Sequence, residues 1–124
     1  MLFFDLFRNE PRLVNISAGD TLFREGDPGE TMYVLLSGSA DILVGERVVE
    51  TVEAGGVVGE LGVVETGPRS GTVRARMPCT FVEIDQARFR FLVEETPYFA
   101  VEVMKVMAGR LRCCDAHVHS LTVR

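Results

Sequence analysis

The chain has 124 residues, of which 47% are hydrophobic, and its formal net charge at pH 7 is −5. This length and composition suit one domain with a hydrophobic core that needs no disulfide or metal cross-link. The acidic balance argues against nucleic acid as a direct partner, because phosphate backbones are recognised by clustered lysine and arginine. A single small anion stays possible, since one arginine and a few backbone amides can hold it.

Residues 1–7 are mostly apolar but lack the basic flank and cleavage site of a signal peptide, and we interpret them as a short packed helical segment. No apolar run approaches the roughly 20 residues that span a bilayer, so no membrane association is predicted. The odd number of cysteines indicates no disulfide framework and favours a reducing cytoplasm. They are Cys79, Cys113 and Cys114. His117 and His119 lie near two of them, but without paired ligand spacing we predict no metal site.

Short runs rich in Val, Ile, Thr and Phe alternate with Gly, Asp and Pro over the first ninety residues, which indicates β structure. The expected strands cover residues 12–17, 21–25, 31–37, 38–44, 47–52, 72–77 and 80–85. One hairpin is expected across Ser37 and Gly38. A second is expected at Gly45 and Glu46, because glycine in the first loop position suits a type II′ turn. Many short strands at near-regular spacing are typical of a sandwich or a jelly roll.

After Asp85 the pattern becomes helical. Residues 86–96 carry apolar side chains at helical spacing, and Pro97 then stands at a favourable first position of a longer helix. Its apolar positions alternate in steps of four and three, as in a coiled coil. They are Ala100, Met104, Met107, Leu111, Cys114, Val118 and Leu121. The stripe would either pack on the β structure or meet the same helix of a second subunit, and the homodimer is favoured.

The stretch from Gly59 to Thr72 combines a carboxylate, glycines, an arginine and hydroxyls. Glu60 begins a run short enough for one helical turn, and a helix N-terminus attracts anions. Arg69, stiffened by Pro68, can hold a phosphate with its planar fork. A phosphate would repel Glu60, which suits a neutral donor such as a ribose hydroxyl. The residues alone leave a phosphosugar pocket and a surface Glu60–Arg69 ion pair, worth little in stability, equally open.

The smaller residues of this stretch suit a ligand site. Gly59 and Gly62 would let the backbone approach a ligand closely. Ser70 and Thr72 can donate hydroxyl hydrogen bonds, and Gly71 leaves space beside them.

This stretch resembles the phosphate-binding cassette of the cyclic nucleotide-binding domain family. The family pattern is Gly-Glu-Leu, a small residue, an aliphatic residue, a short spacer, Arg, two small residues, Thr and Val. The matching residues are Gly59, Glu60, Leu61, Gly62, Val63, Arg69, Ser70, Gly71, Thr72 and Val73. Residues 23–42 resemble the family's upstream hairpins, so the resemblance covers nearly the whole chain. The chain departs from the family at Gly71, where alanine is usual, and at Val58, where Phe or Ile often precedes the cassette.

The resemblance implies a mainly β fold, a double-stranded β-helix (jelly-roll-like β-roll) with a short N-terminal helical segment and two C-terminal α-helices. It implies a single cyclic nucleotide-binding domain over residues 1–124. The β-roll is expected over about 12–85 and the helices over about 86–121.

The resemblance also implies residue roles. Glu60 would accept a hydrogen bond from the ribose 2′-hydroxyl, and Arg69 would pair with the cyclic phosphate. The amides of Leu61, Gly62 and Ser70 would complete the phosphate cradle. The expected site therefore comprises Gly59, Glu60, Leu61, Gly62, Arg69, Ser70, Gly71 and Thr72.

The implied function is non-catalytic binding of cAMP or cGMP, with cAMP favoured, by a sensor whose C-terminal helix moves over the base. Ser70 is compatible with either nucleotide, and Met107, Leu111 and Arg112 are candidates to cover the base. The 124 residues hold no helix-turn-helix after the last expected helix, so the expected partner is an effector protein rather than DNA. The alternative is a ligand-free protein–protein interaction module. A cupin-like metalloenzyme is disfavoured because both histidines lie outside the β region.

Overall fold

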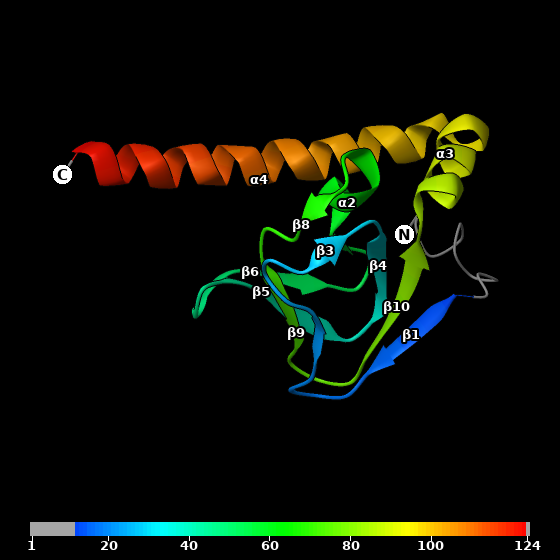
Figure 1. The fold of residues 1–124 in the computed structure, drawn as a ribbon, viewed down its shortest axis with the longest axis horizontal. Helices are drawn as coiled ribbons and strands as arrows, with labels where there is room; N and C mark the ends of the chain where they lie inside the picture. The colour runs from blue at the N-terminus through cyan, green and yellow to red at the C-terminus, as the bar shows by residue number, and fades with distance from the viewer. Residues whose placement is uncertain (1–11, 124) are drawn as a thin grey trace. The chain divides into compact units, whose positions relative to one another are not determined.

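A computed structural model describes residues 12–123, and in the last helix it describes side chains only up to residue 113. The helical segment expected at residues 1–7 lies outside the described residues. The chain forms two compact units, one up to Arg90 and one from Phe91 onwards. Figure 1 shows the strands and helices of the chain, coloured by residue number. Within residues 12–123, none of the helices has the length and apolar character required to cross a membrane.

The first unit contains two four-stranded antiparallel sheets. One sheet has the order β1 (Leu13–Ile16), β10 (Cys79–Ile84), β4 (Met32–Ser37) and β7 (Val57–Val58). The other has the order β2 (Thr21–Phe23), β9 (Thr72–Ala75), β5 (Ser39–Val44) and β6 (Arg47–Glu53). A small sheet pairs β3 (Pro28–Gly29) with β8 (Gly67–Pro68), and the single-turn helix α2 (Glu60–Val64) follows β7.

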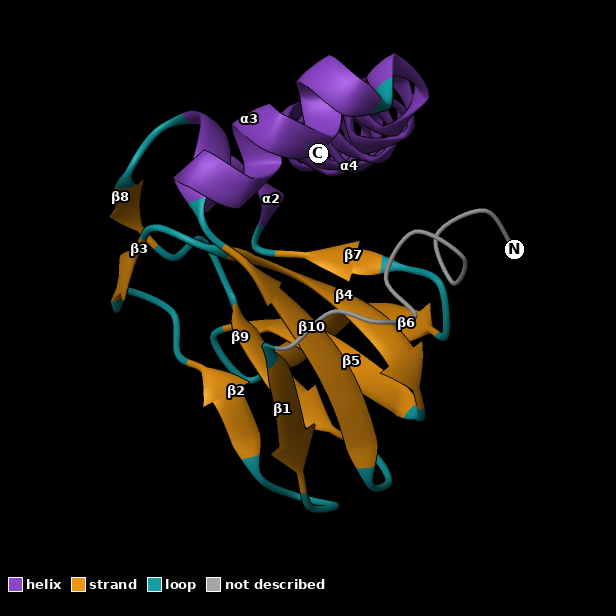
Figure 2. Cartoon of the chain, turned by 90° about the vertical axis from the view of Figure 1, so that its right-hand side faces the viewer, coloured by secondary structure: helices purple, strands orange, loops and turns teal. Residues whose placement is uncertain are grey.

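The two large sheets pack face to face as a β-sandwich, which confirms the expectation of a β-rich fold (Figure 2). Both sheets contribute side chains to one buried cluster because alternate residues of each strand point inward. The cluster consists of Leu35, Ala40, Val52, Val58, Val73, Ala75, Cys79 and Phe81.

The hairpin expected across Ser37 and Gly38 is wrong. β4 pairs with β10 and β7, whereas β5 pairs with β6 and β9, so the chain crosses from one sheet to the other at this turn. Gly38 has a φ of 102°, and a Cβ atom there would lie 2.5 Å from the carbonyl oxygen of Pro78. Both facts require glycine at the crossing. Alternation of apolar residues predicts a strand but does not say which sheet it joins.

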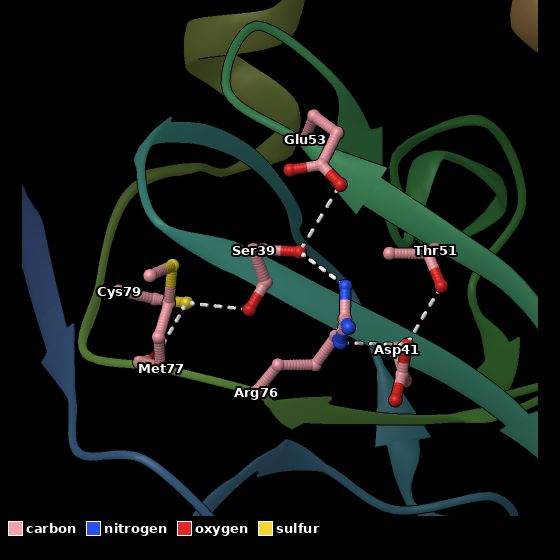
Figure 3. Close-up of polar contacts among 7 residues, drawn as sticks. All are labelled: Ser39, Asp41, Thr51, Glu53, Arg76, Met77 and Cys79. Atoms are coloured by element: carbon pink, nitrogen blue, oxygen red, sulfur yellow. Dashed lines mark hydrogen bonds and ion pairs between the residues drawn. The ribbon is translucent and has the colours of Figure 1, made fainter.

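Polar contacts at Ser39 hold this crossing in place (Figure 3). The Ser39 hydroxyl donates to the Glu53 carboxylate over 3.3 Å and accepts from Nη1 of Arg76 over 3.2 Å. The Ser39 carbonyl accepts from the Arg76 backbone N–H over 2.9 Å and from the Cys79 thiol over 3.3 Å. The start of β5 is therefore tied to its neighbour β6 and to the segment after β9.

The second expected hairpin is confirmed. β5 and β6 pair up to Val44 and Arg47, with Gly45 and Glu46 between them. Gly45 has a φ of 63°, and no non-glycine residue in the described part of the chain has a positive φ. A positive φ at the first loop position alone agrees with a type II′ turn.

Two helices follow the strands, as expected: α3 (Gln86–Glu95) and α4 (Pro97–Val123). Asp85 caps α3, because its carboxylate accepts the backbone N–H of Arg88 over 2.7 Å. Among the side chains of α4 up to residue 113, those of Phe99 and Val103 are buried. Two members of the expected apolar stripe, Met104 and Leu111, are 57% and 63% exposed. The side chains of Cys114, Val118 and Leu121 lie outside the described residues.

Candidate functional site

The backbone of Arg69 is fixed on both sides by the turn that precedes β3. Its N–H donates to the carbonyl of Asp27 over 2.7 Å, and its carbonyl accepts the N–H of Gly26 over 2.9 Å. The Asp27 carboxylate closes this turn by accepting the N–H of Arg24 over 3.1 Å. The backbone position of Arg69 is therefore set by residues 26 and 27, which lie some forty residues earlier in the chain.

The side chain of Arg69 is folded inward and is only 9% exposed. Nη1 donates to the Thr31 carbonyl over 2.7 Å, and Nη2 donates to the Thr31 hydroxyl over 3.1 Å. A longer contact of 3.4 Å joins Nη1 to the carbonyl of Gly59. Nε is buried and has no hydrogen-bond partner among the described residues. Because Thr31 meets both terminal nitrogens, the edge formed by Nε and Nη2 keeps spare donors.

One face of the guanidinium lies on an aromatic ring. The Cζ atom of Arg69 is 4.2 Å from the ring centroid of Phe23 and 6.0 Å from that of Tyr33. A cation at these distances is attracted by the negative face of a ring. The Tyr33 ring is in turn 6.2 Å from that of Phe81 in an edge-to-face arrangement. The arginine is thus placed against the aromatic part of the sandwich.

Three glycines make room for this arginine. A Cβ atom at Gly29, Gly59 or Gly62 would lie 2.6, 2.7 or 2.9 Å from the nearest atom of the Arg69 side chain. Gly59 and Gly62 were expected to admit a ligand close to the backbone. In the structure their missing side chains make room for the side chain of Arg69 itself.

Glu60 is the first residue of α2 and is only 5% exposed. Burial lowers the pKa of Arg69, because a cation loses hydration there, and the nearby Tyr33, Asp27 and Glu60 oppose this shift. Both charged residues are buried, and the hydrogen bonds of Arg69 within the described residues go to Thr31 and Gly59. The geometry therefore differs from a surface ion pair between Glu60 and Arg69.

The backbone amides expected in the phosphate cradle differ in availability. The N–H of Gly62 donates to the carbonyl of Gly59 over 3.0 Å, so it is already engaged within the turn of α2. Leu61 is 53% exposed and Ser70 is exposed. Leu61 and Ser70 therefore lie at the surface of the site, whereas Gly62 lies beneath it.

The remaining two expected residues have structural explanations of their own. Gly71 is buried, and a Cβ atom there would lie 2.9 Å from the carbonyl oxygen of Leu43. This close approach explains glycine where the family usually has alanine. The hydroxyl of Thr72 accepts the backbone N–H of Glu25 over 2.9 Å, which ties β9 to the segment that follows β2.

Three residues that shape the site were missed by sequence reasoning: Phe23, Gly29 and Thr31. They lie in the upstream stretch 23–42, whose resemblance to the family gave strands and turns but no side-chain roles. The part of the chain that the structure describes contains no group of three or more side chains suited to hold a metal ion.

Comparison with known proteins identifies a matching family model and several relatives. Over residues 13–96 the chain matches the family model described as the cyclic nucleotide-binding domain. It is 33% identical over 107 residues to the cAMP-activated global transcriptional regulator CRP of Salmonella typhimurium, covering 82% of this chain and 51% of that protein. It is 31% identical over 113 residues to a cAMP-dependent protein kinase regulatory subunit of Colletotrichum trifolii, covering 81% of this chain and 28% of that one.

A solved structure shares the fold. The c-di-GMP responsive global regulator CLP of Xanthomonas campestris superposes with a TM-score of 0.81 at 25% identity, covering 96% of this chain and 63% of that one. The chain spans about half the length of the transcriptional regulator that it matches. The matched range, the identity to these regulators and the sandwich fold lead to one conclusion: the chain belongs to the cyclic nucleotide-binding domain family.

Proposed function

We propose that this domain binds a cyclic nucleotide without transforming it and acts as a signalling sensor. Arg69 pairs with the cyclic phosphate and Glu60 accepts a hydrogen bond from the ribose 2′-hydroxyl. The amides of Leu61 and Ser70 complete the phosphate contacts. The N–H of Gly62 joins them only if its bond to the Gly59 carbonyl opens.

The unpartnered Nε of Arg69 is the observation that supports this proposal most. A buried donor on a charged group costs about 1–3 kcal/mol or more when it lacks an acceptor. Thr31 satisfies the opposite edge of the guanidinium, so the missing acceptor belongs on the Nε and Nη2 side. A phosphate has two oxygens at the spacing of this edge and carries the matching charge. The site chemistry therefore fits a cyclic phosphate.

Glu60 has the second role because a carboxylate accepts hydrogen bonds only. Placed in one site with a phosphate-binding arginine, it suits a neutral hydroxyl of the same ligand. A ribose that carries both a phosphate and a free 2′-hydroxyl offers a matching group to each of the two charged residues. This combination distinguishes a nucleotide from inorganic phosphate.

We favour cAMP over cGMP as the ligand. Relatives bear names that refer to cAMP, and another bears a name that refers to c-di-GMP. The hydroxyl of Ser70 is exposed and suits either purine. The base would be covered by α4, for which Met107, Leu111 and Arg112 are candidates.

The signal would be a ligand-dependent shift in the population of α4 positions, since a ligand favours the conformation that it binds more tightly. The exposed apolar residues Met104 and Leu111 suit a contact between α4 helices of two subunits. A separate effector protein would recognise the changed surface.

Isothermal titration calorimetry with cAMP and with cGMP tests the proposal. Arg69→Ala should weaken binding by about thirtyfold to a thousandfold, because a charge-assisted pair is lost. Arg74→Ala is the matched control, since Arg74 is an exposed arginine on the neighbouring strand β9, and it should leave affinity unchanged. Absence of heat with both nucleotides, from protein shown to be free of copurified ligand, would refute the sensor and favour a ligand-free interaction module.

A further inference from the structure

Phe23 contacts both ends of the segment that carries the binding residues. At one end the Arg69 guanidinium lies over its ring, with Cζ 4.2 Å from the centroid. At the other end, a Cβ atom on Gly59 would lie 3.3 Å from Cε2 of Phe23, so the ring covers the backbone just before α2. Gly59 has a φ of 72°, which places α2 and its first residue Glu60. One ring therefore lies beside Arg69 and beside Gly59, the residue that precedes Glu60.

The contact with the ring and the contact with a ligand use different parts of the guanidinium. A cation–π contact uses the flat face, whereas hydrogen bonds to a phosphate use the N–H groups at the edge. Thr31 occupies the edge formed by Nη1 and Nη2, and the edge formed by Nε and Nη2 keeps spare donors. Arg69 can therefore stay on Phe23 while a phosphate binds.

The Phe23 ring is held in place by Tyr33 and by the buried cluster of the sandwich. Phe23 lies 6.0 Å from the Tyr33 ring, and Tyr33 is fixed by the hydrogen bond of its hydroxyl to the Glu83 carboxylate over 3.2 Å. Phe23 and Tyr33 both pack against the buried cluster of the sandwich. The arginine thus rests on a surface that the core keeps rigid.

We propose that Phe23 is a positioning residue for ligand recognition: its ring holds the Arg69 guanidinium in the orientation that the cyclic phosphate meets. This inference rests on the proposed function. It extends the site to a residue outside the phosphate-binding cassette, on strand β2. An aliphatic side chain there would fill the space but would remove the cation–π contact that holds one face of the guanidinium.

Calorimetry with cAMP and cGMP on Phe23→Leu tests the inference. We expect affinity to fall by about two- to tenfold, the size of a cation–π contact. Phe23→Tyr keeps the ring and should restore the affinity of the wild type. Phe91→Leu is the matched control, because it makes the same change at a ring that is 49% exposed on α3 and is not part of the buried cluster. Unchanged or higher affinity in Phe23→Leu would overturn the positioning role.

A double-mutant cycle with Arg69→Gln shows whether Phe23 acts through the arginine. Without ligand, Phe23→Leu should shift the urea unfolding midpoint less in the Arg69→Gln background than in the wild type. Equal shifts in both backgrounds would mean that the ring does not hold the guanidinium, and would also overturn the inference. Failure of wild-type protein to bind either nucleotide would instead refute the proposed function and the positioning role with it. The two failures are thus distinguishable.

Discussion

Thr31 accepts hydrogen bonds from both terminal nitrogens of Arg69, one through its carbonyl and one through its hydroxyl. The two residues are 38 positions apart in sequence, yet Thr31 fixes the edge of the guanidinium that faces away from the spare donors. The carbonyl belongs to the backbone, so a substitution of Thr31 removes only the hydroxyl contact and tests it directly.

Thr31→Val should lower the free energy of unfolding by about 1–2 kcal/mol, because a buried charged donor loses its acceptor while the side-chain volume is kept. Urea unfolding of the ligand-free protein measures this change. Thr31→Ser restores the hydroxyl and should recover most of the loss. Equal stability of the Val and Ser variants would show that the hydroxyl does not stabilise Arg69.

Gly59→Ala should destabilise the protein more than Gly45→Ala. Both glycines have positive φ, 72° and 63°, so each substitution costs about 1–2 kcal/mol for the left-handed conformation. A Cβ at Gly59 also meets Arg69 at 2.7 Å, whereas at Gly45 nothing lies within 4 Å. Thermal unfolding of both variants measures the difference, and it should shrink in an Arg69→Ala background. A difference that survives the loss of Arg69 would assign the clash to another neighbour.

Asp85 should make stability depend on acid pH. Its carboxylate accepts the backbone N–H of Arg88 and pairs with Arg12, and these contacts lower its pKa. A lowered pKa in the folded state gives a stabilisation that is complete above the unfolded value of about 3.9 and is lost as pH falls through the folded pKa. Unfolding midpoints measured from pH 6 down to about pH 2 should show this loss, and Asp85→Asn should remove that part of it. An unchanged pH profile in Asp85→Asn would assign the acid sensitivity to other carboxylates.

Met104→Glu should dissociate the proposed dimer through α4. Met104 is 57% exposed, so a charge there costs the single chain little but would be buried between two helices. Sedimentation equilibrium of the wild type should give a dimer and of the variant a monomer. Glu94→Lys changes an exposed residue on α3 and serves as the control. A monomeric wild type would rule the helix-mediated dimer out.

The sequence predicted the parts of the fold that depend on local pattern. The type II′ hairpin at Gly45, the single turn of α2 and the start of α4 at Pro97 each follow from residue types at fixed spacing, and all are present. The crossing at Gly38 could not be predicted, because it depends on the pairing of β4 with β10 and of β5 with β9, two strands that lie far along the chain. Local periodicity contains no information on such a contact.

Only the part of the candidate site that lies in one continuous stretch of sequence could be predicted. Glu60 and Arg69 belong to one continuous motif, and the structure buries both. The ring of Phe23 and the acceptors of Thr31 reach Arg69 through strand pairing and loop closure, which no local motif encodes. The role of Gly29 was equally hidden, since its missing side chain matters only because Arg69 lies above it.

Two backbone hydrogen bonds join Arg69 to the turn at Gly26 and Asp27, and they couple the movements of the two segments. A main-chain displacement at position 69 is transmitted to that turn, since moving one without the other breaks two short hydrogen bonds. Arg69 and the turn at Gly26 and Asp27 are therefore expected to move together. An isotope label in the exposed turn would register events at the arginine without changing any side chain.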